Sequence, residues 1–332
     1  MNTSIDRDDS KRLMVFAGRS SQELGQRIAG RLGIDLGGVN LKTFANGEIY
    51  VRFEESVRGA DVFLVQSTCR PVNDSLMELL IMINAAKLAS AHRITAVIPW
   101  YGYSRQDKKS APREPITARL IADLLNASGV DRVLTMDLHA GQVQGFFGVP
   151  VDHMTALPMF VDDFKDRVYR GDLAEPLVVV SPDAGRAKLA NHFAERLGAT
   201  LAVLTKQRPD HNEAEITFLI GDVKGRAAVL IDDMIDTAGT LCAGAKVVKE
   251  AGATRVFAAA THGLLSGSAV ERLRESVIEQ VVITDTVPLP ETAVGSDLFR
   301  VLSVDRILAD SVHNVFCDES VSAIFAGENQ LF

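Results

Sequence analysis

The chain has 332 residues, of which 47% are apolar, and its 35 basic and 43 acidic side chains give a net charge of -8. This length exceeds that at which a single hydrophobic core usually stops growing, so two domains are expected, and the apolar content excludes a disordered chain. The negative charge excludes a general nucleic-acid binder, so any affinity for phosphate must be local.

Short β-branched runs alternate with longer helical stretches along the whole chain. In the first half, strands are predicted at 13–17, 39–44, 49–53, 62–66, 94–99 and 132–136, with helices at 73–91 and 116–128. In the second half, strands are predicted at 177–181, 201–205, 216–220, 227–231, 255–261 and 280–283, with helices at 184–197, 238–251 and 267–275. This alternation predicts an α/β fold with mainly parallel sheets.

Segments 131–137 and 225–232 resemble each other, since each places a basic residue before an apolar strand and an acid at its end. They suggest two similar domains, at 12–155 and 156–332, with the last helix and tail able to pack back on the first domain. The predicted helix at 75–91 is apolar on nearly every side, so it needs cover from a core or from another subunit.

The cysteines are Cys69, Cys242 and Cys317, and they form no Cys-x-x-Cys pair. They favour a reducing compartment over a disulfide framework or a zinc site. The first residues are polar and lack the apolar segment of a secretory signal, and no apolar run approaches the roughly 20 residues that span a bilayer. We therefore expect a cytoplasmic protein that binds neither a membrane nor nucleic acid.

Segment 227–240 (AAVLIDDMIDTAGT) carries the strongest functional signal. An apolar strand ends in Asp232 and Asp233, and a turn then opens a helix. Free amides and the dipole at a helix start bind anions, and Gly239 allows a phosphate to approach the backbone closely. Residues predicted to hold the ligand are Asp232, Asp233, Asp236, Thr237, Ala238, Gly239 and Thr240.

Two carboxylates beside a phosphate loop would repel the phosphate unless they face another group. Carboxylates accept hydrogen bonds from sugar hydroxyls, directly or through Mg²⁺. A ligand with a phosphate at one end and vicinal hydroxyls at the other is ribose 5-phosphate. The alternative is that the acids cap the helix and Gly239 merely turns the chain.

This loop resembles the phosphoribosyl-diphosphate loop of type I phosphoribosyltransferases and of ribose-phosphate pyrophosphokinases. The rest of the chain, from about residue 13 onward, resembles the pyrophosphokinases. The matching segments are 44–48 (FANGE), 55–59 (ESVRG), 96–109 (AVIPWYGYSRQDKK), 136–140 (MDLHA), 144–147 (QGFF) and 181–185 (SPDAG). The resemblance implies two type I phosphoribosyltransferase-like domains, with ATP on the first and ribose 5-phosphate on the second.

The implied enzyme is a ribose-phosphate diphosphokinase, which moves the β,γ-diphosphoryl group of Mg-ATP to C1 of ribose 5-phosphate. By resemblance, the residues that hold the nucleotide are Phe44, Asn46, Glu48, Arg105, Gln106 and His139. The first three would hold the adenine and would come from a neighbouring subunit. Read alone, Phe44 would be a core residue. In-line transfer needs the nucleotide charge neutralised and the β-phosphorus aligned with the C1 hydroxyl.

His139 and Asp183 resemble the family's Mg²⁺ ligands. Because Mg²⁺ prefers oxygen, His139 could instead donate to a phosphate oxygen or act through water, and Asp183 could be a helix cap. Lys206 and Arg208 resemble the family's catalytic cations on a loop that closes over the substrates, although alone they would be surface charge. Pro209 departs from the family pattern and would stiffen this loop.

Ser56, Arg58, Ser320 and Ser322 match a regulatory anion site of the family between subunits, where inorganic phosphate would activate and ADP would compete. The family also assembles as hexamers, so a homo-hexamer is implied.

Two other functions stay open. A phosphoribosyltransferase would share the loop but transfer ribose to a base without ATP. A non-catalytic regulatory subunit would be expected to have lost the catalytic residues, which are present here.

Overall fold

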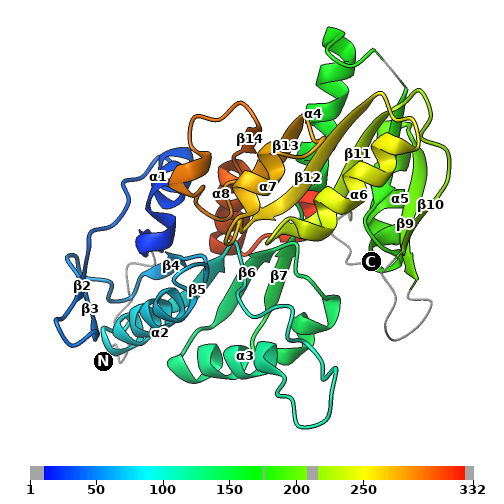
Figure 1. Cartoon of the computed structure of the whole chain (residues 1–332). Helices are drawn as coiled ribbons and strands as arrows, with labels where there is room; N and C mark the ends of the chain where they lie inside the picture. The colour runs from blue at the N-terminus through cyan, green and yellow to red at the C-terminus, as the bar shows by residue number, and fades with distance from the viewer. Residues whose placement is uncertain (1–10, 175, 208–215, 326–332) are drawn as a thin grey trace, which may run out of the picture. The chain divides into compact units, whose positions relative to one another are not determined.

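The computed structural model describes residues 11–174, 176–207 and 216–325. These fall into two compact units. The first comprises 11–135, 142–153 and 305–325, and the second comprises 136–141 and the described part of 154–304. Each unit is α/β with a mainly parallel sheet, which confirms the predicted fold class (Figure 1). None of the helices in the described ranges is both long and apolar enough to cross a membrane.

The sheet of the first unit has the strand order β1 (Leu13–Ala17), β4 (Asp61–Val65), β5 (Arg93–Ile98), β6 (Arg132–Met136) and β7 (Val151–Met154). Strands β1, β4, β5 and β6 run parallel, and β4 is buried along its whole length. A buried parallel strand needs cover on both faces, which helices provide. These helices are α1 (Gln22–Arg31), α2 (Val72–Leu88), α3 (Thr117–Ser128) and α8 (Asp305–Phe316).

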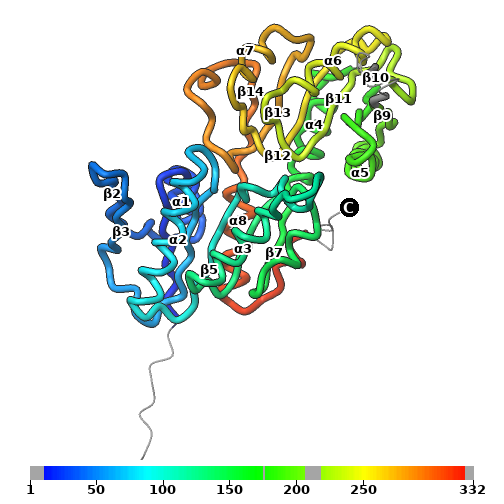
Figure 2. Tube along the Cα trace, turned by 60° about the horizontal axis from the view of Figure 1, so that its bottom comes forward, coloured from blue at the N-terminus to red at the C-terminus, as the bar shows by residue number. Residues whose placement is uncertain are grey.

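Helix α8 packs against α1, and Arg31 forms an ion pair with Asp305 at 2.8 Å. In Figure 2 the red trace of α8 therefore lies among the elements of the first unit. Strands β2 (Val39–Thr43) and β3 (Ile49–Phe53) form a separate antiparallel hairpin. Helix α2 buries one face against β4 and β5, but Met77 and Leu88 are exposed on it. The core therefore covers only part of this apolar helix.

The sheet of the second unit has the order β10 (Ile216–Ile220), β9 (Thr200–Gln207), β8 (Leu177–Ser181), β11 (Ala227–Ile235), β12 (Arg255–Gly263), β13 (Gln280–Thr284) and β14 (Phe299–Leu302). Neighbouring strands in this sheet run parallel, except that β9 and β10 are antiparallel. From β8 the chain moves outward to β9, and from β11 it moves the other way to β12. This reversal between β8 and β11 is a topological switch point, where ligands bind in α/β sheets.

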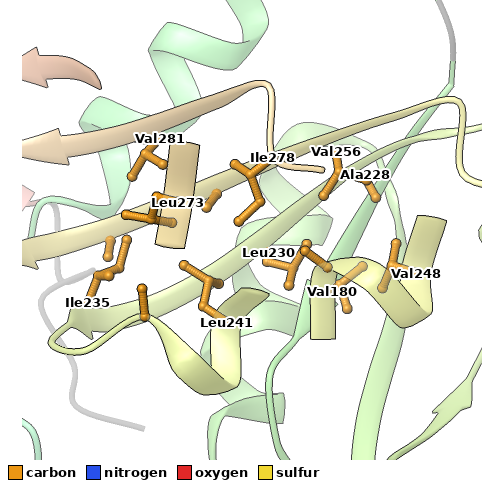
Figure 3. Packing of buried hydrophobic residues seen from close by; sticks show 14 of the residues in the cluster. Val180, Ala228, Leu230, Ile235, Leu241, Val248, Val256, Leu273, Ile278 and Val281 are labelled. Carbon is orange, nitrogen blue, oxygen red and sulfur yellow. The ribbon is translucent and has the colours of Figure 1, made fainter. Parts of the chain in front are cut away.

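Helices α4 (Leu157–Arg170) and α5 (Ala187–Leu197) cover one face of this sheet, and α6 (Gly239–Glu250) and α7 (Ala269–Arg274) cover the other (Figure 1). Figure 3 shows Leu241 and Val248 of α6 and Leu273 of α7 directed at sheet residues such as Leu230. Each fully buried aliphatic side chain contributes roughly 1.5–3 kcal/mol. This packing fixes where α6 begins.

Some predicted boundaries were wrong. The strand predicted at 227–231 continues to Ile235, because β12 is equally long and pairs with it through Gly263. The helix predicted at 184–197 opens as a 3₁₀ turn at Ala184–Arg186 before α5 starts. Helices α1 and α4 and strands β7 and β14 were not predicted, and the last helix, which was expected without bounds, is α8.

Candidate functional site

The turn that was predicted to bind a phosphate, at 236–240, lies at the switch point of the second unit. Ala238 adopts the left-handed conformation, with φ of 59°, and α6 begins at Gly239 without a side-chain cap. Two hydrogen bonds hold the turn in place. Ser266 donates its backbone N–H to the Asp236 carbonyl at 2.9 Å, and the Arg272 side chain donates to the Thr237 carbonyl. The first amides of a helix have no intrahelical acceptor, so this rigid turn presents donors for an anion.

Two acids lie in the last part of β11, beside this turn. Asp233 is 5% exposed, and its Oδ2 lies 2.7 Å from His139 Nδ1 and 2.8 Å from Arg186 Nη2. Asp232 Oδ1 accepts the Asp233 backbone N–H at 2.8 Å and lies 3.5 Å from Arg186 Nε. The structure thus brings together three predicted residues, His139, Asp232 and Asp233, around a cation that was not predicted.

The environment drives the pKa values of these acids apart. Burial, followed by the adjacent charge of Asp233, raises the pKa of Asp232. Burial alone would also raise the pKa of Asp233, but its contacts with His139, Asp232 and Arg186 lower it below its ordinary value. Asp233 is therefore the ionised anchor of the group, and Asp232 is the acid whose charge depends most on what binds beside it.

Arg186 comes from the connection between β8 and α5. Its backbone N–H donates to Asp183 Oδ1 at 3.0 Å, so Asp183 caps the 3₁₀ turn that carries Arg186. The cap alternative for Asp183 is thus realised, and its side chain is exposed rather than joined to the acidic pair. In the sequence, Arg186 is a single basic residue three positions after Asp183. This pattern is too common to predict a functional role.

His139 is held in place by a buried polar network below its turn. Asp137 Oδ2 accepts the Ala156 backbone N–H at 2.9 Å and the Thr261 hydroxyl at 2.6 Å. His262 Nε2 lies 3.2 Å from the Asp137 carbonyl, and burial lowers the pKa of this histidine. Thr261 and His262 were missed, and Asp137 was noted only as an acid at a strand end, because their partners are up to 125 positions away in sequence.

The predicted adenine residues lie at the tip of the β2–β3 hairpin in the first unit. Phe44 is 52% exposed, so it is not a core residue, and its ring centroid lies 5.8 Å from that of Tyr50. Asn46 Oδ1 accepts the Glu48 backbone N–H at 3.2 Å, and Phe44 donates its backbone N–H to the Glu48 carbonyl at 2.8 Å. These contacts close the turn and present an aromatic face to solvent.

Arg105 and Gln106 lie in the loop between β5 and α3 of the first unit. The Gln106 carbonyl accepts the Ala118 backbone N–H at 3.1 Å, and its side-chain Oε1 accepts the Thr117 hydroxyl at 2.5 Å. Gln106 is therefore fixed to the start of α3, while Arg105 is exposed beside it.

The predicted catalytic cations are described only in part. Lys206 belongs to β9, where its backbone pairs with Thr217 of β10. Its side chain, together with Arg208 and Pro209, lies outside the described residues.

Ser320 and Ser322 line a cavity of about 400 Å³ in the first unit. Their hydroxyls are 2.9 Å apart, and Arg93 and Arg132 also line the cavity. Ser56 and Arg58 are exposed and are not among its lining residues. Within this unit the four predicted regulatory residues are therefore not brought together.

The fold and the site define an α/β protein whose second sheet has, at its switch point, a helix start suited to a phosphate group. Two family models match the chain, the N-terminal domain of ribose phosphate pyrophosphokinase over residues 13–129 and the phosphoribosyl synthetase-associated domain over residues 208–326. Neither model covers residues 130–207. Relatives that align with nearly the whole chain include this segment.

The ribose-phosphate pyrophosphokinase of Caldanaerobacter subterraneus is 52% identical over 94% of this chain and 98% of its own length. That of Clostridium perfringens is 51% identical over 95% of this chain and 98% of its own. The crystal structure of phosphoribosylpyrophosphate synthetase from Mycobacterium smegmatis has a TM-score of 0.87 and 45% identity, covering 93% of this chain and all of that one. The chain belongs to the ribose-phosphate pyrophosphokinase family, as the sequence motifs predicted.

Proposed function

We propose that this chain transfers the β,γ-diphosphoryl group of Mg-ATP to the C1 hydroxyl of ribose 5-phosphate, giving 5-phosphoribosyl 1-diphosphate and AMP. The C1 oxygen attacks the β-phosphorus, the bond from that phosphorus to the oxygen bridging to the α-phosphate breaks, and the hydroxyl proton is released. The observation that carries the proposal is the phosphate turn of α6 set beside Asp232 and Asp233. Membership of the family supports the same reaction.

The phosphate turn suits the 5-phosphate of the sugar. Amides at the start of α6 and the exposed hydroxyls of Thr237 and Thr240 supply donors, and the helix dipole favours negative charge. Asp232 and Asp233 supply acceptors for the ribose hydroxyls. The sugar would then lie with its phosphate at α6 and its hydroxyls at the end of β11, which leaves the C1 hydroxyl free to attack the β-phosphorus.

The residues present fit Mg²⁺ when it is shared with a nucleotide. Among the described residues, no cluster of three or more His, Cys, Asp or Glu side chains is arranged to hold a metal by itself. Mg²⁺ is usually bound through one or two carboxylates plus substrate phosphates, and the oxygens of Asp232 and Asp233 meet that requirement. His139 and Asp183 remain the ligands proposed from the resemblance. The ion would offset negative charge on the transferred group.

Nucleotide binding is assigned to the first unit. The exposed ring of Phe44 offers a surface for adenine, with Asn46 and Glu48 beside it for the polar edge of the base. Arg105 and Gln106 are proposed to contact the nucleotide. Lys206 and Arg208 are proposed to neutralise the β-phosphoryl group as charge builds, which is the largest contribution expected from side chains.

Regulation and assembly follow the family in this proposal. The cavity lined by Ser320 and Ser322 would take inorganic phosphate as activator and ADP as competitor, and Ser56 and Arg58 would complete it from another subunit of a homo-hexamer. The cytoplasmic location stays a prediction from sequence.

The reaction is tested by mixing purified protein with Mg-ATP and ribose 5-phosphate and measuring AMP. The proposal expects AMP and 5-phosphoribosyl 1-diphosphate in equal amounts. Asp233→Asn should abolish most of the activity, whereas Asp222→Asn, an exposed acid in the same unit, should not change it. ATP-independent transfer of ribose to a base would point to a phosphoribosyltransferase, and absence of both reactions would point to a regulatory subunit.

A further inference from the structure

Arg186 connects three elements of the second unit at a single point. Its side chain is 19% exposed, and Nη2 lies 2.8 Å from Asp233 Oδ2 and 2.6 Å from His139 Nδ1. Nη2 also donates to the His139 carbonyl at 3.2 Å, and Nε lies 3.5 Å from Asp232 Oδ1. One guanidinium thus contacts the end of β11 and the turn that carries His139.

The acidic pair needs a positive charge because two neighbouring carboxylates in a partly buried position repel each other. Arg186 forms an ion pair with Asp233 and lies within ion-pair distance of Asp232. Among the residues that the structure describes, no other lysine or arginine forms an ion pair with either acid. The other charged contact is His139, which carries a positive charge only when protonated. Arg186 therefore stands where a bound cation would otherwise balance the pair.

The shape of the arginine side chain also matters. The guanidinium is planar and offers several donors in a fixed fork, so Nε and Nη2 can engage different partners at once. A lysine ammonium is a single point of charge on a flexible stem and would not span Asp232, Asp233 and His139 in the same way.

We propose that Arg186 is a positioning residue and the internal counter-ion of the site: it holds Asp232, Asp233 and His139 in one array and lowers the affinity of the acids for a free divalent cation. The inference rests on the proposed function, because the array matters only if these acids orient the sugar and its metal. The Coulomb repulsion between Arg186 and a second cation at the same oxygens gives the direction of the effect.

The test measures binding of Mn²⁺ alone, by electron paramagnetic resonance, to the full-length protein without nucleotide or sugar. Arg186→Gln should bind Mn²⁺ at least about tenfold more tightly than the wild type, since a unit charge within about 4 Å of the ion is removed. Arg186→Lys keeps the charge and should stay within about threefold of the wild type. Arg186→Gly removes the charge without leaving an amide and carries the same prediction if the Gln variant does not fold.

Arg255→Gln is the matched control, since it removes an ion-paired arginine from the start of β12, at the opposite end of the same sheet. Its Mn²⁺ affinity should not change. In AMP formation, both Arg186→Gln and Arg186→Lys should lower kcat at least about tenfold, because neither side chain can make all the contacts of the fork. A purely structural role would lower thermal stability without changing Mn²⁺ affinity.

The inference is overturned if Arg186→Gln or Arg186→Gly folds and binds Mn²⁺ within twofold of the wild type, or if Arg186→Lys binds Mn²⁺ as tightly as those variants. Either result can be obtained while the wild type still forms AMP. Failure of the proposed function would appear separately, as a wild-type protein that forms no AMP.

Discussion

Glu78 provides a sharp test of how the first unit is held together. This carboxylate lies on α2 and is 1% exposed, in a helix that also buries Leu76, Leu79 and Met82. It accepts the backbone N–H of Arg19 at 2.8 Å, the Nε of the same residue at 2.5 Å and the Nε2 of Gln66 at 2.9 Å. The connections that follow β1 and β4 are thereby tied to α2.

Replacing Glu78 with Ala removes all three acceptor contacts. Removal of one partner of a buried ion pair costs roughly 3–5 kcal/mol. Since the Arg19 side chain is 47% exposed and can regain water, we expect about 2–3 kcal/mol. With a urea dependence of about 2–3 kcal/mol per molar, the unfolding midpoint should fall by about 1 M. Glu78→Gln, which keeps the shape, should show a smaller decrease.

The single tryptophan, Trp100, makes the assay specific for this unit. It is 6% exposed and follows β5, so its fluorescence reports unfolding of the first unit. Asp74→Asn is the control, since it removes an exposed charge from the first turn of the same helix and should cost less than about 1 kcal/mol. Equal midpoints for Glu78→Ala and Asp74→Asn would refute the reasoning.

The same substitution should also affect nucleotide binding. Arg19 Nη1 donates to the Thr43 hydroxyl at 2.9 Å, and Thr43 ends β2 directly before Phe44 at the tip of the hairpin. With Glu78 removed, the hairpin loses one of its fixed contacts with the unit. A several-fold higher KM for ATP with a nearly unchanged KM for ribose 5-phosphate is therefore expected.

Three further predictions concern other parts of the chain. Lys206→Ala should lower the maximal rate by at least about 100-fold while ATP still binds by calorimetry; unchanged turnover would remove this residue from the mechanism. Burial raises the pKa of the Cys69 thiol, so a thiol reagent followed by peptide mass spectrometry should label exposed Cys317 first and Cys69 only after unfolding. Hydrogen bonds from Lys11 and Arg93 lower the pKa of Asp318 to about 2, so its contribution is present above about pH 4 and is lost as the pH falls toward 2. Protection of the amides at the end of α8, measured relative to their intrinsic exchange rates at each pH, should fall over that range, and unchanged protection would contradict the assigned contacts.

The local features of the phosphate turn were readable from sequence. An apolar strand, adjacent acids and a Thr-Ala-Gly-Thr run specify a strand, a turn and a helix start through nearest-neighbour geometry alone. The alternation of strands and helices likewise predicted the α/β class, because hydrophobic periodicity is a local property. The gap between the strands predicted at 39–44 and 49–53 likewise located a turn, but the residue type of Phe44 did not indicate that its ring is exposed.

The sequence pattern could not predict which side chains contact one another in the folded protein. The contacts of Arg186 with Asp233 and His139 join segments that are 47 positions apart, and Arg186 reaches the two acids because β8 and β11 are neighbours in the sheet. The buried role of Glu78 is of the same kind, since only packing against Arg19 and Gln66 distinguishes it from an ordinary surface acid. Residue type and spacing therefore determined the chemistry that is available, whereas tertiary contacts decided which charges compensate one another, because electrostatic interactions depend on distance in space and on burial rather than on separation along the chain.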